Sequence, residues 1–253
     1  MSDFDTIIYE KHDGIAKVTL NRPQVLNRYN IKMRDELYEI LSAIRDDPDV
    51  QVVIFNGSGE RAFCVGADLT EFGTAPSPVI ARQVRWKRDV WGLLESLKQP
   101  LIAALHGYVL GSGVEIALFC DIRIASNDAV FGFPEVALGM IPAAGGSQTL
   151  PRTVGVGKAL QSLLSCEYID SEEALRIGLV NRLVSREELI STAEMIAGDI
   201  KSNNNVAVRY AKEAVKRGRD LPLGQGLALE KSMAEIVRIL AGNESSIMSA
   251  IFT

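Results

Sequence analysis

Two carboxylates in apolar surroundings are the side chains of this sequence best suited to do chemistry. Glu115 lies in the segment 114–119 (VEIALF), whose other members are all apolar, and Glu135 lies between Pro134 and Val136. Carboxylates are rarely buried unless they are paired or functional. An apolar setting raises the pKa of such a group toward neutrality, where it can exchange protons with a substrate. The pattern also fits structural roles, a helix-start cap for Glu115 and a solvated loop carboxylate for Glu135.

Two glycine-containing turns could supply backbone N–H groups to a ligand. The first is 63–68 (FCVGAD) and the second is 106–113 (HGYVLGSG), and each follows a predicted strand. A helix that begins near Gly111 would leave its first N–H groups unpaired, and two such groups from separate loops can form an oxyanion hole. The second turn is not a dinucleotide fingerprint, because Ile116 stands where a third glycine is needed, and no Gly-Lys-Ser/Thr phosphate loop follows.

The elements that must position these residues follow an α/β pattern rather than that of a sandwich or a bundle. Short apolar strands alternate with helical periodicities up to about Ala144, and helices dominate afterwards. The predicted strands cover residues 7–9, 15–20, 50–55, 101–105, 122–125 and 129–131. The predicted helices cover residues 31–44, 79–97, 111–119, 157–165, 171–177, 186–200, 206–217 and 222–240.

Two connections in this pattern carry further information. Asp13-Gly14 joins the first two strands and predicts a tight hairpin. The segment 68–78 lacks periodicity and carries Gly73 and Pro76, as is typical of a lid or a binding loop. The helix at 171–177 could be capped by either Asp170 or Ser171.

Composition excludes several classes of protein. The net charge of -5, with Lys and Arg scattered among acids, argues against nucleic-acid binding. Three cysteines without a C-x-x-C pair and only two histidines give a metal site little to work with, so no metal is predicted. No apolar run approaches the roughly 20 residues of a membrane span, and no apolar signal segment opens the chain. We therefore expect a cytoplasmic protein.

The sequence resembles the enoyl-CoA hydratase/isomerase (crotonase) superfamily over nearly its whole length. The matching stretches occur in the order and spacing of the family. They are residues 18–23, 26–27, 61–69, 106–115, 120–125, 131–135, 145–152, 171–174 and 178–180. The resemblance implies a crotonase-like spiral of ββα units over residues 1–195. It also implies a C-terminal helical region over residues 196–253 that assembles trimers, often paired into hexamers.

The resemblance implies a role for each candidate residue. The backbone N–H groups of Ala67 and Ser112 correspond to the oxyanion hole, and Glu115 and Glu135 to the two glutamates that flank a water in the hydratases. The implied activity is reversible addition of water across the 2,3 double bond of an enoyl-CoA. Isomerisation or other enolate chemistry on an acyl-CoA, or a non-catalytic acyl-CoA-binding subunit, are the alternatives.

Coenzyme A enters as part of the substrate, and no separate cofactor is implied. The family pattern places it along Leu26, Arg28, Val65, Ala67, Asp68 and Leu69. Some positions depart from that pattern: Ser112 and Ala143 replace usual glycines, and Arg28 replaces a small residue and could either pair with a phosphate or be solvated. Relatives usually end in a basic tail, whereas residues 243–253 carry no basic side chain. Phe72, Trp86 and Trp91 could wall the acyl pocket or belong to the core.

Overall fold

Two sheets form the framework of the protein, which the computed structural model describes for residues 4–241. The larger sheet has the order β1-β2-β3-β5-β7-β10 and is parallel except for the first pair. Its strands are β1 (Ile7–His12), β2 (Ile15–Leu20), β3 (Val52–Gly57), β5 (Leu101–Leu105), β7 (Ile122–Ser126) and β10 (Arg182–Val184). The smaller sheet has the order β4-β6-β8-β9 and is parallel except for its last pair. Its strands are β4 (Ala62–Cys64), β6 (Tyr108–Leu110), β8 (Val130–Gly132) and β9 (Ile169–Asp170).

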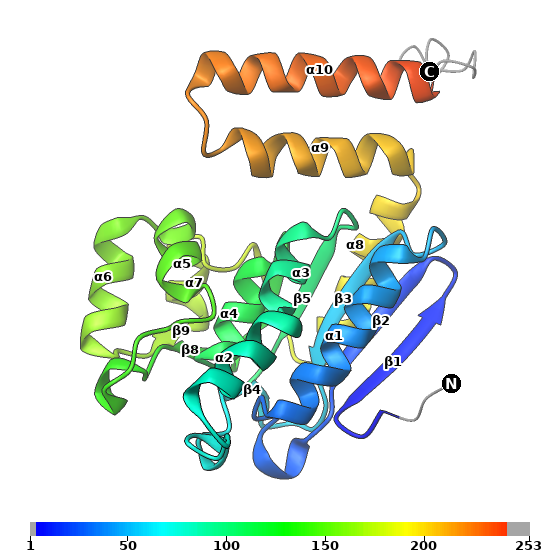
Figure 1. Cartoon of the computed structure of the whole chain (residues 1–253). Helices are drawn as coiled ribbons and strands as arrows, with labels where there is room; N and C mark the ends of the chain where they lie inside the picture. Colours follow the sequence, from blue (N-terminus) through cyan, green and yellow to red (C-terminus); the bar gives the residue numbers. More distant parts are fainter. Residues whose placement is uncertain (1–3, 242–253) are drawn as a thin grey trace.

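Helices cover both faces of the larger sheet, so its central strands are buried (Figure 1). Helix α1 (Ile31–Asp46) and α3 (Val90–Ser96) contribute to one core, and α8 (Leu189–Lys201) closes the other face through Leu189, Ala193 and Ala197. The remaining helices are α2 (Pro78–Lys87), α4 (Ser112–Phe119), α5 (Gly146–Val154), α6 (Val156–Ser165), α7 (Ser171–Arg176), α9 (Asn205–Gly218) and α10 (Leu223–Ala241). Single turns of 3-10 helix are η1 (Pro23–Val25), η2 (Leu69–Glu71) and η3 (Val136–Leu138). The predicted α/β class is confirmed.

The predicted hairpin and most predicted elements are present. Asp13 and Gly14 adopt left-handed φ values of 48° and 76°, as a two-residue turn between paired strands requires. Asp170, not Ser171, caps α7 by accepting a hydrogen bond from the Glu173 N–H at 2.8 Å. The Ser171 hydroxyl instead donates to the backbone oxygen of Asn127.

One predicted helix is wrong, because residues 79–97 form two helices rather than one. Helix α2 ends at Lys87 and α3 begins at Val90. The Asp89 carboxylate accepts a hydrogen bond from the Gly92 N–H at 3.0 Å and so starts the second helix. Apolar periodicity alone could not show this break, since it continues across both helices.

The C-terminal helices form a pair beside the core (Figure 1). Lys212 of α9 joins this pair to the core through an ion pair with Asp121 at 2.7 Å and a hydrogen bond to the backbone oxygen of Gln99. Helix α10 packs on α9. The division near residue 195 stays a prediction, and the tail at 243–253 lies outside the described residues. None of the helices within residues 4–241 has the length and apolar character needed to cross a bilayer.

Candidate active site

Glu115 lies on a short helix that is buried all round. Every residue of α4 is buried, and Glu115 is only 2% exposed. Its Oε1 accepts hydrogen bonds from the N–H groups of Ala144 and Gly146, each at 2.9 Å. Gly146 is the first residue of α5, so the carboxylate lies where that helix presents unpaired N–H groups.

Burial and these donors have opposite effects on the pKa of Glu115. Burial disfavours the charged form and raises the pKa above the ordinary value for glutamate. The N–H groups of Gly146 and Ala144, the Ser112 hydroxyl and the positive charge of Arg85 act in the opposite direction. Burial wins, so Glu115 gains a proton more readily than an exposed glutamate.

Glu135 lies on the loop that follows β8. Its Oε1 approaches the turn before α4 so closely that a Cβ atom on Gly111 would lie 2.7 Å from it. Its Oε2 is buried and has no hydrogen-bond partner in the described part of the chain. Burial raises the pKa of Glu135, and the negative charge of Glu115 raises it further. The charge on Glu115 therefore makes Glu135 hold its proton more strongly.

Two backbone N–H groups that could bind a ligand lie beside this pair. Ala67 follows β4 and Ser112 follows β6, and these strands pair in parallel, so their carboxyl ends meet at one edge. A Cβ atom on Gly66 would lie 3.7 Å from the Ser112 nitrogen, which shows how closely the two turns approach. Within residues 4–241 neither the Ala67 nor the Ser112 N–H has a hydrogen-bond acceptor. Paired free amides of this kind can stabilise an oxyanion.

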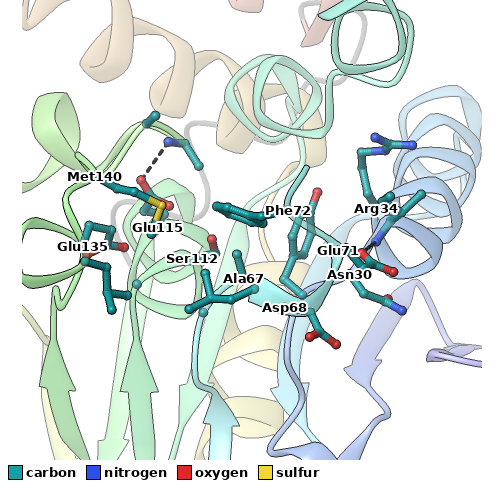
Figure 2. Close-up of a pocket in the computed structure, with 18 of the residues that line it drawn as sticks. Asn30, Arg34, Ala67, Asp68, Glu71, Phe72, Ser112, Glu115, Glu135 and Met140 are labelled. Carbon is teal, nitrogen blue, oxygen red and sulfur yellow. Dashed lines mark hydrogen bonds between the residues drawn. The ribbon is translucent and has the colours of Figure 1, made fainter. Parts of the chain in front are cut away.

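A cavity of about 560 Å³ brings most of the predicted site residues together (Figure 2). In the view of Figure 2, Glu115 and Glu135 occupy one side, Asp68 and Arg34 the other, and Ala67 and Ser112 lie between them. The cavity is lined by the predicted residues Val65, Ala67, Asp68, Leu69, Ser112, Glu115 and Glu135, together with Phe72 and Trp91.

Three predicted residues lie away from this cavity lining. Leu26 lines a neighbouring hollow, and its backbone oxygen accepts a hydrogen bond from the Val65 N–H at 3.2 Å. The Arg28 side chain is exposed, and its backbone oxygen accepts a hydrogen bond from Arg22 at 2.8 Å. Trp86 is 65% exposed and lines a smaller adjoining cavity.

Sequence reasoning missed several residues that organise the site. Arg22 forms an ion pair with Asp68 at 3.0 Å and so joins the loop after β2 to the loop after β4. Tyr29 lines the cavity, and its buried hydroxyl has no partner in the described residues. Arg85 of α2 donates to the backbone oxygen of Ala143 at 2.7 Å. The sequence carries no motif for such contacts, because each joins segments that meet only in the folded chain.

Two carboxyls with raised pKa, beside two amides that have no acceptor in the described part of the chain, are suited to one class of protein, an enzyme that stabilises an oxyanion while it moves protons. The family model described as enoyl-CoA hydratase/isomerase matches residues 10–243. The chain belongs to this family, and the resemblance to it is confirmed.

Individual relatives agree with this membership. The chain is 42% identical to the short-chain-enoyl-CoA hydratase of Clostridium acetobutylicum, over 90% of this chain and 87% of the relative. It is 40% identical to the crotonyl-CoA hydratase of Syntrophomonas wolfei, over the same shares of the two chains. The crystal structure of an enoyl-CoA hydratase from Bacillus anthracis superposes with a TM-score of 0.86 at 39% identity and covers 91% of this chain and 90% of its own. The spiral fold with C-terminal helices is thus that of the family.

Proposed function

We propose that the protein is an enoyl-CoA hydratase that adds water reversibly across the 2,3 double bond of an enoyl-CoA thioester. One observation carries the assignment of residues. Glu115 and Glu135, both with raised pKa, line the same cavity as the free N–H groups of Ala67 and Ser112. The hydratase names of the relatives support the reaction.

The two amides are proposed to bind the thioester carbonyl oxygen. When water adds to Cβ, negative charge moves through the conjugated system to that oxygen and an enolate forms. Amides that point at the developing charge stabilise it more than they stabilise the neutral carbonyl, so they lower the barrier. One such donor typically contributes about 3 kcal/mol. The serine side chain at position 112 does not prevent this role, since the backbone N–H is the donor.

The two glutamates are proposed to divide the proton transfers. Glu115 receives two N–H donors, which favour its charged form, whereas Glu135 Oε2 has no donor within the described residues. We therefore assign Glu115 as the ionised group that takes the proton from water. Glu135 is the protonated group that delivers a proton to Cα, and the roles reverse in dehydration.

Coenzyme A is proposed to lie along the loops that lead into the cavity. Val65, Asp68 and Leu69 line it together with Ala67. The ion pair between Arg22 and Asp68 holds the loop after β2 against the loop after β4. The exposed Arg28 side chain is free to reach a phosphate, and Leu26 supports the loop through its bond from Val65. No separate cofactor enters this scheme.

We also propose that the chain assembles as a homotrimer or hexamer in the cytoplasm. The helical pair α9–α10 carries large apolar side chains that are exposed to solvent: Val215 is 72%, Leu223 78% and Ile239 64% exposed. Such surfaces on a pair of helices that packs little against its own core favour contact with other copies. Light scattering coupled to size-exclusion chromatography would report the mass, and a monomer at micromolar concentration would refute this part of the proposal.

Turnover of enoyl-CoA thioesters tests the function. We expect crotonyl-CoA and longer 2-enoyl-CoA substrates to lose their conjugated-thioester absorbance and to gain the mass of one water. Glu135→Gln should lower kcat by about 10²-fold or more, as the loss of a general acid requires. Glu172→Gln, an exposed glutamate on α7, is the matched control and should leave kcat unchanged.

Two outcomes would contradict the proposal. Conversion of 3-enoyl-CoA to 2-enoyl-CoA without net addition of water would identify an isomerase. Binding of the thioester without any turnover would identify an acyl-CoA-binding subunit.

A further inference from the structure

One peptide unit connects a helix on the wall of the cavity to the catalytic carboxylate. Arg85 Nη2 donates to the backbone oxygen of Ala143 at 2.7 Å. That carbonyl and the N–H of Ala144 belong to the same planar peptide, and the N–H donates to Glu115 Oε1 at 2.9 Å. A continuous chain of hydrogen bonds thus runs from a guanidinium through one peptide to Glu115.

From this chain we infer that Arg85 is a positioning residue for Glu115. It fixes the orientation of the 143–144 peptide and strengthens the N–H that the peptide offers to the carboxylate. The inference deepens the proposed function, since it rests on Glu115 as the acid/base group.

Two physical effects give Arg85 this influence. A carbonyl that accepts a bond from a cation is polarised, and its peptide N–H becomes a better donor, because hydrogen bonds in a chain strengthen one another. The positive charge also acts directly on Glu115 and lowers its pKa. Both effects favour the ionised form, which is the form assigned to Glu115.

The surroundings leave Arg85 available for this role. Within residues 4–241 no carboxylate lies at ion-pair distance from Arg85, whereas Arg34 pairs with Asp35 and Arg88 with Glu39. Arg34, Arg85 and Arg88 line the cavity. Of these three, Arg85 donates to a backbone oxygen, whereas the other two pair with acids.

Other titratable groups face Glu115 from different elements and must be considered in any pH measurement. They are Glu135 after β8, whose pKa is raised by burial and by the charge of Glu115, and the buried thiol of Cys64 on β4, whose raised pKa keeps it neutral. Asp89 lines the adjoining cavity but is engaged with the Gly92 N–H. Neither Cys64 nor Asp89 supplies positive charge, so a loss of Arg85 is not compensated from these positions.

The arrangement also links the cavity wall to the chemistry. Arg85 lies in the last turn of α2, which follows the long loop 72–77. When this helix is docked on the loop that carries Ala143, the peptide is held in the orientation that serves Glu115.

The experiment compares Arg85→Met with Arg85→Lys and with Arg82→Met, a control on the same helix whose guanidinium stacks on Trp86 instead. Arg85→Met should raise the pKa of Glu115, so the acidic limb of the kcat/KM profile should move to higher pH by about half a pH unit or more. Half a unit equals about a threefold change in the ratio of ionised to protonated carboxylate at a given pH. Arg85→Lys keeps the positive charge and should show a smaller shift than Arg85→Met. Arg82→Met should show no shift.

A second measurement does not require activity. Carboxyl ¹³C NMR of glutamate-labelled protein reports the titration of Glu115 directly, with its signal assigned as the one lost in Glu115→Gln. If the Glu115 signal titrates alike in wild type, Arg85→Met and Arg82→Met, the inference is overturned. If it shifts as expected but no enoyl-CoA is hydrated, the positioning role stands and the proposed function fails.

Discussion

Replacement of Glu115 by glutamine separates the catalytic role of this side chain from its structural role. Glutamine has the same shape, and its Oε1 can still accept the two N–H bonds from Ala144 and Gly146. Hydrogen bonds to a charged acceptor contribute about 1.5–3 kcal/mol and neutral ones about 0.5–1.5 kcal/mol, so the two bonds together lose about 2–3 kcal/mol. The cost of burying a charge disappears at the same time.

The pKa shows which effect is larger. Burial outweighs the donors, because the pKa of Glu115 is raised rather than lowered. A carboxyl with a raised pKa destabilises the folded state above that pKa, where the native group must hold an unfavourable charge. We therefore expect Glu115→Gln to unfold with equal or higher free energy than wild type at pH 7. The difference should grow as pH rises from the ordinary glutamate pKa of 4.5 to the raised pKa of Glu115, and should then level off.

Activity should change in the opposite direction. Loss of a general base lowers kcat by about 10²–10⁴-fold, equal to about 3–5 kcal/mol in the barrier. Crotonyl-CoA hydration gives kcat, and urea unfolding gives the free energy of unfolding, with Glu172→Gln as the control in both. A variant that keeps kcat within about threefold of wild type, or that loses more than about 2 kcal/mol of stability, would refute the reasoning.

Two further substitutions test the close approach of Gly111 to Glu135 and the burial of His106. Gly111→Ala forces a left-handed residue with φ 49° to carry a Cβ atom 2.7 Å from Glu135 Oε1. It should destabilise by about 1–3 kcal/mol and lower kcat, whereas Gly157→Ala, where a Cβ atom meets nothing within 4 Å, should do neither. Burial lowers the pKa of His106 from 6.5 to about 4, so its protonation favours unfolding as pH falls from 6.5 toward 4. Wild type should lose about 2–3 kcal/mol more than His106→Gln between pH 7 and 4.5 in urea unfolding, and equal losses would contradict this.

Elements made of a longer apolar run could be predicted from the sequence, and short ones could not. The buried run Leu101–Leu105 and the apolar helix at Ser112–Phe119 appear close to their predicted bounds. Strands β4 and β6 contain three residues each, too few for an alternation to be visible. Helix α5 was also missed, because it begins at a glycine and contains Pro151, which weakens any helical signal.

The site shows the same limit more sharply. Apolar surroundings and the resemblance to a family pointed to Glu115 and Glu135, because a charged residue in such a segment is conspicuous in sequence. The donors that set the pKa of Glu115 are backbone N–H groups of Ala144 and Gly146, and every residue carries such a group. Only the position of the chain decides which amides reach the carboxylate, so no residue type could have indicated them.

The smaller sheet explains why residues far apart in sequence form one site. Strands β4, β6 and β8 are adjacent and parallel, and the chain leaves all three at the same edge. The turn after β4 supplies Ala67, helix α4 directly after β6 supplies Ser112 and Glu115, and the loop after β8 supplies Glu135.

The parallel ladder between β6 and β8 holds two of these turns in register. The Gly111 N–H donates to the backbone oxygen of Gly132 at 2.9 Å, directly beyond the paired residues Leu110 and Gly132. A shift of one residue in this register would reverse the face on which each side chain lies and would separate the two carboxyls. The catalytic pair is therefore a property of strand pairing as much as of the two glutamates, and a change at Gly132 that disturbs the register should impair both at once.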